Sequence, residues 1–387
     1  MRLYGKSALA GRRCVAVLHF RKAALLRRTI FPERLPLLLA VFHSLIKFAG
    51  LIFLLCVSAE VFAGETLRVL AWPGYADADL VKVFEKRTKA KVEVTLIDSD
   101  EALWQKISTR AAQDYDVFAV NTAELQRYIS AALVVPIDTQ AMPNLARQLP
   151  RFRERKNIPG IMQGEQVFAI PYTYAEMGLI YDRDQIKEPP SSITSLWDPR
   201  YRGKVLIYNG GAHNFALAAQ ALGLPKPFRM GVEDWPKAVH KLIDLRRNML
   251  TFYTRPEESV ELFKNRGAAL LFANYGSQQV QLLKKAGVDV GYAIPREGAL
   301  AWLDCWVITQ GAKNKKLATA WIDYLLEAEP SAALVSRQGL ANTTSLSPFN
   351  QSSDRLVWLE PVEDVARRNL LWERILSGDS AARVLQP

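Results

Sequence analysis

The sequence TLRVLAWPGY, residues 66–75, decides how the rest of the chain is interpreted. Its first seven residues are mostly apolar and predict a short strand, and the Pro-Gly pair at 73–74 predicts a turn directly after it. The next segment, Asp77–Thr88, has apolar residues at helical spacing and begins with a candidate N-cap. The order strand, turn, helix is the opening unit of an α/β fold.

The residues downstream repeat this order. Lys91–Ile97 alternates as a strand, Glu101–Ala112 has helical spacing, and Asp116–Val120 predicts a third strand. In the second half, Val205–Tyr208 predicts a strand that ends at the turn Asn209-Gly210-Gly211, before a further helix. No low-complexity linker separates the halves. We expect an α/β fold with two mostly parallel sheets, each flanked by helices and joined by strands that cross between them.

Length and charge support a two-lobed globular protein that does not bind nucleic acid. The chain has 387 residues, of which 49% are hydrophobic and 23% are charged, so it can form two sizeable cores. Its net charge is +11, but residues 1–63 account for eight of these eleven charges. The remaining chain is only weakly basic and has no stripe of Lys and Arg for a phosphate backbone.

The first 63 residues have the features of a secretion signal. A basic stretch, Arg21–Arg34, precedes the apolar run Phe48–Val57, and small residues follow up to Ala63. This pattern predicts a signal peptide that is cleaved before residue 64, and a periplasmic mature protein. An uncleaved N-terminal membrane anchor is the alternative, since Leu37–Val57 nearly reaches the length of a membrane span but is interrupted by Lys47.

Catalytic and metal-binding motifs are missing from the sequence. After residue 63 there are one cysteine, Cys305, and two histidines, His213 and His240, and no HExxH, CxxC or Gly-x-Ser-x-Gly motif. We therefore expect no enzyme, no metal and no cofactor. One acidic cluster precedes the predicted second helix and is expected to cap it; it consists of Asp98, Asp100 and Glu101.

Aromatic and acidic residues at strand ends predict a binding site for an amine. Trp72 and Tyr75 follow the first strand, where ligands bind in open parallel sheets. Trp302 and Asp304 alternate along an extended segment and therefore point to the same side. An indole face gives about 0.5–2 kcal/mol to a cation, and a carboxylate adds a charge-assisted hydrogen bond. The structural alternative is that Trp302 packs in the core and Asp304 caps a turn.

Six segments, in their order and spacing, resemble the periplasmic spermidine/putrescine-binding proteins of ABC transporters: residues 71–75, 115–122, 169–172, 195–204, 274–277 and 295–304. The resemblance implies the type II periplasmic-binding-protein fold, in which two lobes close on a ligand. It implies a monomer that delivers a small amine to a membrane permease. We expect residues 65–172 and 302–345 in lobe 1, residues 173–301 and 346–387 in lobe 2, and residues 1–63 as the leader.

The resemblance also implies roles for particular side chains. Trp72 and Tyr75 would enclose the aliphatic chain of the ligand, and Trp302 with Asp304 would bind an ammonium group. Four more residues at corresponding positions complete the expected ligand-binding set: Asn121, Thr122, His213 and Tyr275.

The chain departs from the family where a second acidic anchor is expected, because Gly210 and His213 stand there. A long polyamine needs a carboxylate for each buried ammonium. The candidate ligands are therefore a polyamine such as putrescine or spermidine, a shorter diamine, a monoamine, or a zwitterion such as an aminophosphonate or amino acid. The acidic end of a zwitterion would meet His213 and the backbone N–H groups of residues 209–211. A clamp that senses a ligand without transport is the second hypothesis.

Overall fold

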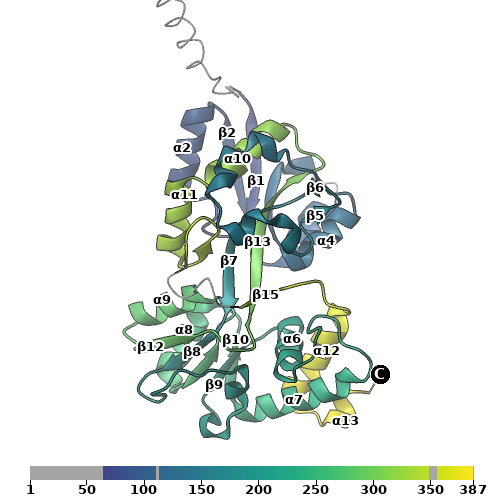
Figure 1. Cartoon of the computed structure of the whole chain (residues 1–387), viewed down its shortest axis with the longest axis vertical. Helices are drawn as coiled ribbons and strands as arrows, with labels where there is room; N and C mark the ends of the chain where they lie inside the picture. Colours follow the sequence, from purple (N-terminus) through teal and green to yellow (C-terminus); the bar gives the residue numbers. More distant parts are fainter. Residues whose placement is uncertain (1–63, 110–112, 348–354, 387) are drawn as a thin grey trace, which may run out of the picture. The chain divides into compact units, whose positions relative to one another are not determined.

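The computed structural model describes residues 64–109, 113–347 and 355–386, and the predicted signal peptide lies outside these ranges. Within them, strands and helices alternate and form two separate main sheets, which confirms the α/β prediction (Figure 1). In the described ranges, no helix combines the length and the apolar character needed to cross a membrane.

The first sheet has strand order β14-β7-β13-β3-β1-β2, and the short strands β4 and β15 also pair with β13. Strands β1, β2, β3 and β7 run in one direction, whereas β13 is antiparallel to both of its neighbours β3 and β7. The bounds are β1 Thr66–Ala71, β2 Lys91–Leu96, β3 Val117–Asn121, β4 Val134–Val135, β7 Ile170–Met177, β13 Ala299–Thr309, β14 Ala341–Asn342 and β15 Leu356–Trp358.

The second sheet has strand order β10-β9-β11-β8-β12 and follows the same plan. Its strands β9, β10, β11 and β12 share a direction, and β8 is antiparallel to its two neighbours. In each main sheet a parallel set is thus interrupted by an inserted strand of opposite direction, β13 in the first and β8 in the second, and the short strands β14 and β15 of the first sheet share the direction of β13. The bounds are β8 Leu179–Asp182, β9 Val205–Tyr208, β10 Met249–Tyr253, β11 Leu270–Phe272 and β12 Val290–Ala293; a separate hairpin joins β5 Met162–Gln163 and β6 Gln166–Val167.

The chain passes between the sheets at three places: from β7 to β8, from β12 to β13, and from β15 to α12 (Val365–Leu376). The first crossing is a single residue, Gly178, which lies so close to Tyr292 that an added Cβ would be 2.7 Å from that ring. The Tyr292 hydroxyl accepts from Gly178 N–H and donates to the Glu176 carbonyl. The predicted lobe boundaries at residues 172 and 302 fall inside β7 and β13, and they stay a prediction.

Helices cover both faces of the first sheet (Figure 1). On one face, α2 packs against α10, with the rings of Phe84 and Trp321 5.1 Å apart. On the other face, apolar side chains of α3 and α4 pack on β3. The bounds are α2 Ala78–Thr88, α3 Asp100–Ser108, α4 Thr122–Ser130, α5 Pro150–Arg153, α10 Lys315–Leu325 and α11 Ala328–Ala333.

The second sheet is also enclosed by helices. Helices α6 and α7 pack on one face, with α12 packed against both of them, and α8 and α9 pack on the other face. The bounds are α6 Gly211–Ala221, α7 Asp234–Asn248, α8 Pro256–Arg266, α9 Ser277–Lys285 and α13 Ala381–Val384.

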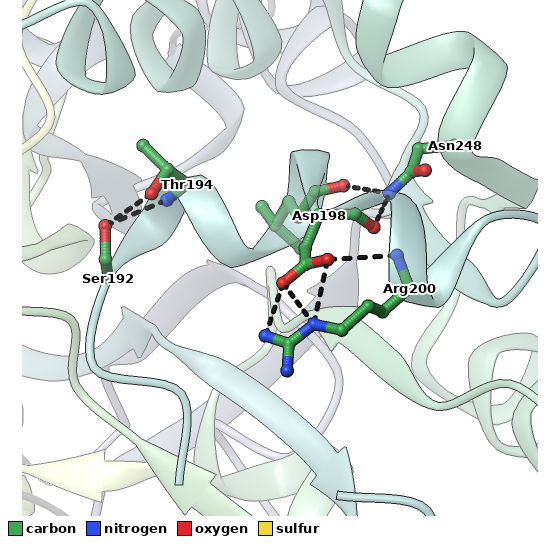
Figure 2. A network of polar contacts seen from close by, with 6 residues as sticks. Ser192, Thr194, Asp198, Arg200 and Asn248 are labelled. Carbon is green, nitrogen blue, oxygen red and sulfur yellow. Dashed lines mark hydrogen bonds and ion pairs between the residues drawn. The ribbon is translucent and has the colours of Figure 1, made fainter.

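The approach to β9 is fixed by polar contacts (Figure 2). The Asn248 amide donates to the carbonyls of Leu196 and Asp198, at 2.9 and 2.8 Å. The Asp198 carboxylate accepts from the backbone N–H and the guanidinium of Arg200. These residues order the turns that lead into the sheet, so this part of the family-like segment at 195–204 has a structural role.

Candidate functional site

The site is built around Asp304, whose side chain is 7% exposed. It lies on β13 directly opposite Asn121 of β3, so the two side chains are on one face of the first sheet. Tyr75 reaches the same point from the turn after β1, where Gly74 has a φ of 84°. The Tyr75 hydroxyl donates a 2.7 Å hydrogen bond to Asp304 Oδ2. The structure thus brings together three of the predicted residues.

Burial raises the pKa of Asp304 to about 7. The nearby Asp100 carboxylate adds to the increase, whereas hydrogen bonds from Tyr75 and Asn121 oppose it. The Asp304 carboxyl is therefore only partly ionised at neutral pH. A cation placed against it would restore the charge and lower the pKa.

The two tryptophans of the predicted site differ in their hydrogen bonds. Trp302 lies two residues before Asp304 on β13, is 8% exposed, and donates from Nε1 to the Asn274 carbonyl at 2.9 Å. It therefore contacts the loop after β11 of the second sheet as well as packing in the core. Trp72 is half-buried, and its Nε1 has no hydrogen-bond partner among the described residues.

Asp100 is a second carboxylate near Asp304 that the sequence did not assign to the site. The prediction that Asp98, Asp100 and Glu101 cap the second helix is wrong: Ser99 is the N-cap of α3, and its Oγ accepts from Ala102 N–H. Asp100 is in the first turn and remains in contact with solvent. Surrounding protein atoms nevertheless reduce the hydration of its carboxylate, and this desolvation raises the pKa of Asp100 to about 6. Glu124 adds to this increase and Arg127 opposes it.

His213 lies in the first turn of α6, beside the second sheet. Its ring is 5.6 Å from that of Tyr208, which in turn is 6.0 Å from Tyr275. Burial lowers the pKa of His213 to about 4; the Asn274 side chain opposes the change and Arg368 adds to it. The imidazole is therefore neutral at pH 7.

Two predicted ligand contacts use their hydroxyl groups within the fold. Tyr275 donates to the Thr254 carbonyl at 2.7 Å. The buried Thr122 donates to the Leu359 carbonyl at 3.3 Å, on the segment that leads to α12. Asn121 also accepts from Ala123 N–H and so caps α4. These polar groups have structural partners in the described conformation.

A cavity of about 310 Å³ opens beside His213. The start of α4, the start of α6 and the segment Leu359–Val362 form its walls. Its charged lining comprises Glu124, Arg127 and Glu360, with Glu124 and Arg127 in a 2.8 Å ion pair. Among the described residues, no group of three or more His, Cys, Asp and Glu side chains is arranged to hold a metal ion.

Comparison with known proteins gives consistent results. The sequence is 24% identical to the spermidine/putrescine-binding periplasmic protein of Salmonella typhimurium, over 82% of this chain and 93% of that relative. It is 27% identical to the putrescine-binding periplasmic protein PotF of Escherichia coli (strain K12), over 75% of this chain and 81% of that relative.

The fold is similar to that of the spermidine/putrescine ABC transporter substrate-binding protein PotD of Streptococcus pneumoniae. The TM-score is 0.67 at 20% sequence identity, over 84% of this chain and all of that one. This similarity shows the type II periplasmic-binding fold that the sequence predicted. The profile of the bacterial extracellular solute-binding proteins matches residues 79–364, and the chain belongs to this family.

Proposed function

We propose that this protein is the receptor of an ABC transporter and that it binds a small amine through Asp304. The observation that carries the proposal is the buried pair of Asp304 and Tyr75, next to Trp302. Burial raises the pKa of Asp304, so a positive charge beside the carboxyl would stabilise its ionised form. An alkylammonium group supplies that charge, and Trp72 and Trp302 give it apolar and cation–π surface.

The relatives support the same role. Those quoted above are named as periplasmic binding proteins for putrescine or spermidine. We infer a non-enzymatic protein that is exported to the periplasm and hands its ligand to a membrane permease as a monomer. In this proposal the first sheet and its helices form one lobe and the second sheet with its helices the other.

A thermal-shift screen of the purified protein tests the proposal. The panel contains putrescine, cadaverine, spermidine, simple monoamines and ω-amino acids, each with its amine-free analogue as control. A ligand that binds only the folded state adds about 2.7 kcal/mol of stability at 100 times its Kd, so a true ligand raises Tm clearly. We expect amines to raise Tm in the wild type and not in Asp304→Asn. A panel in which no amine raises Tm would contradict the amine receptor.

A further inference from the structure

We propose that Tyr292 is a positioning residue at the hinge between the two sheets, and that its hydroxyl favours the conformation in which the sheets meet at the site. This inference rests on the proposed function, in which the two lobes close on an amine. The type II fold implies that the lobes bend relative to each other. What the structure adds is the side chain that resists the bend, and this side chain is not among the predicted ligand contacts.

Two of the three crossings between the sheets lie side by side. Met177, the last residue of β7, pairs with Leu300 of β13. Gly178 follows this pair on one strand and Gly298 precedes it on the other, so the two glycines lie at the same end of the strand pair. Gly298 has a φ of 96°, and Gly178 is the single residue between β7 and β8. Because glycine has the widest choice of backbone conformation, the bend is expected at these two residues.

The second crossing is attached to the second-sheet side as far as Gly298. The Glu297 carboxylate accepts from the Ser192 hydroxyl at 2.5 Å and from Ile193 N–H at 3.1 Å. These two acceptor contacts belong to a turn that packs on α7 and β11. From α6, the Gln220 side chain donates to the Gly298 carbonyl at 2.8 Å. The residues before β13 are therefore held by the second-sheet side, which leaves the bend to Gly298.

Tyr292 connects the first crossing to the second sheet. It lies on β12 opposite Ile180 of β8, and its hydroxyl reaches the end of β7. There it accepts from Gly178 N–H at 3.1 Å and donates to the Glu176 carbonyl at 2.6 Å. The two groups belong to consecutive peptides on either side of Met177. A bend at Gly178 turns these peptides relative to β12, so it lengthens or breaks both hydrogen bonds.

Close packing around the Glu176 carbonyl fixes the same geometry. A Cβ on Gly276, in the loop after β11, would be 2.7 Å from this carbonyl oxygen. A Cβ on Gly178 would be 2.7 Å from the Tyr292 ring and 2.8 Å from the Ala293 carbonyl oxygen. The end of β7 is thus enclosed by two segments of the second-sheet side, and the Tyr292 hydroxyl supplies the directional contacts among them.

The described conformation has the two sheets in contact at the site. The indole of Trp302, a predicted ligand contact, donates to the Asn274 carbonyl at 2.9 Å. The Ser277 hydroxyl at the start of α9 donates to the Gly339 carbonyl, before β14 of the first sheet, at 2.7 Å. Both bonds join the first-sheet side to the second-sheet side. The Tyr292 hydroxyl therefore stabilises a conformation in which the lobes meet, which is the conformation that holds a ligand between them.

Small-angle X-ray scattering of the full chain without ligand tests this role directly. Tyr292→Phe removes the two hydrogen bonds and keeps the ring. We expect a larger radius of gyration in this variant than in the wild type, because the open conformation becomes more populated. Tyr324→Phe is the matched control, since its buried hydroxyl donates to the Leu80 carbonyl within the first-sheet side. Its scattering should equal that of the wild type.

Isothermal titration calorimetry with putrescine and n-butylamine gives a second measurement. A residue that sets only the closing equilibrium changes the Kd of every ligand by the same factor. In Tyr292→Phe we expect both Kd values to rise by one common factor of about three to ten, the effect of losing a net hydrogen bond. In Tyr324→Phe both should stay unchanged. Circular dichroism melts of each variant establish that the fold is retained.

The outcomes separate this inference from the proposed function. Unchanged scattering in Tyr292→Phe overturns the hinge role, whichever ligand the protein binds. Different factors for the two amines also overturn it, because Tyr292 would then act on the ligand itself. If no amine of the thermal-shift panel binds the wild type but the scattering differs as expected, the amine receptor is overturned and the role of Tyr292 stands.

Discussion

Asp304 beside the first sheet and His213 beside the second carry opposite pKa shifts. At the first sheet, burial raises the pKa of Asp304 to about 7, and at the second sheet it lowers that of His213 to about 4. In each case the low-polarity surroundings favour the neutral form. The difference lies in the neighbours: a carboxylate strengthens the shift at Asp304, whereas the guanidinium of Arg368 strengthens it at His213. A positive charge is therefore favoured beside Asp304, whereas the Arg368 guanidinium disfavours a positive charge on His213.

Replacing Asp304 should have the largest effect on the affinity for an amine. Asp304→Ala is expected to weaken amine binding by about 2–5 kcal/mol, the cost of leaving a buried ammonium without its partner. Calorimetry on the wild type and the variant measures it. Asp323→Ala is the control, because this half-buried carboxylate on α10 bonds to Asn144 and not to the site. An affinity unchanged in Asp304→Ala would remove Asp304 from the site.

The hydrogen bonds that Arg368 makes behind the start of α6 can be removed separately. Arg368→Leu deletes the hydrogen bonds to Ala212 and Pro227 and leaves Glu363 unpaired. Hydrogen bonds to a charged group contribute about 1.5–3 kcal/mol, so the free energy of unfolding should fall by about 2–3 kcal/mol in denaturant titration. Arg383→Leu, on exposed α13 surface, should change it little. Equal stability of the two variants would show that Arg368 does not hold α6 in place.

The pH dependence of amine binding should come from the ionisation of Asp304. An ammonium binds the ionised Asp304, so amine affinity should fall about tenfold, or 1.4 kcal/mol, for each pH unit below about 7. Above that pH the affinity should be constant until the amine itself loses its proton. Asp304→Asn should bind weakly with no such slope. A wild-type profile that stays flat from pH 5 to 8 would mean that Asp304 is not the group that binds the cation.

The smallest effect on amine affinity is expected from removing the hydrogen bond between Tyr75 and Asp304. Tyr75→Phe removes the 2.7 Å bond that stabilises the Asp304 anion, which should cost roughly 0.5–1.5 kcal/mol of amine affinity. It should also move the midpoint of the pH profile upward, because that bond lowers the pKa of Asp304. Tyr172→Phe is the matched control, since its ring packs 5.4 Å from Tyr75. A midpoint that shifts equally in both variants would assign the effect to packing.

The sequence predicts the α/β fold and the acidic end because both depend on local patterns. Alternation along the segment with Trp302 and Asp304 places them on one side, and the turn after the first strand places Tyr75 at its carboxyl end. The sequence patterns that would place Asp100 and Asn274 near these residues are weaker. Asp100 stands in a helix-start pattern that has an ordinary structural explanation, and it approaches Asp304 only through tertiary packing.

The opposite direction of β13 and β8 also cannot be predicted from the sequence. Residues 299–309 have the composition of any buried strand, and nothing local states that they insert between β3 and β7 in the opposite direction. Sequence patterns report which residues form a strand, whereas strand order depends on contacts between residues far apart in the chain. The position of Asn274 also depends on a contact far away in the chain, because its carbonyl accepts a hydrogen bond from Trp302 on the other sheet.

The insertion of β13 has a consequence for how the chain folds. Its partners β3 and β7 are made of residues 117–121 and 170–177, yet they do not pair with each other and need a strand that is synthesised more than 120 residues later. The first sheet therefore cannot close during early synthesis, and its contacts carry a high loop-closure cost. Folding of the whole first core waits until the second sheet has been made. A nascent chain of this design stays open for most of its synthesis, which exposes it to chaperones and to aggregation until β13 arrives.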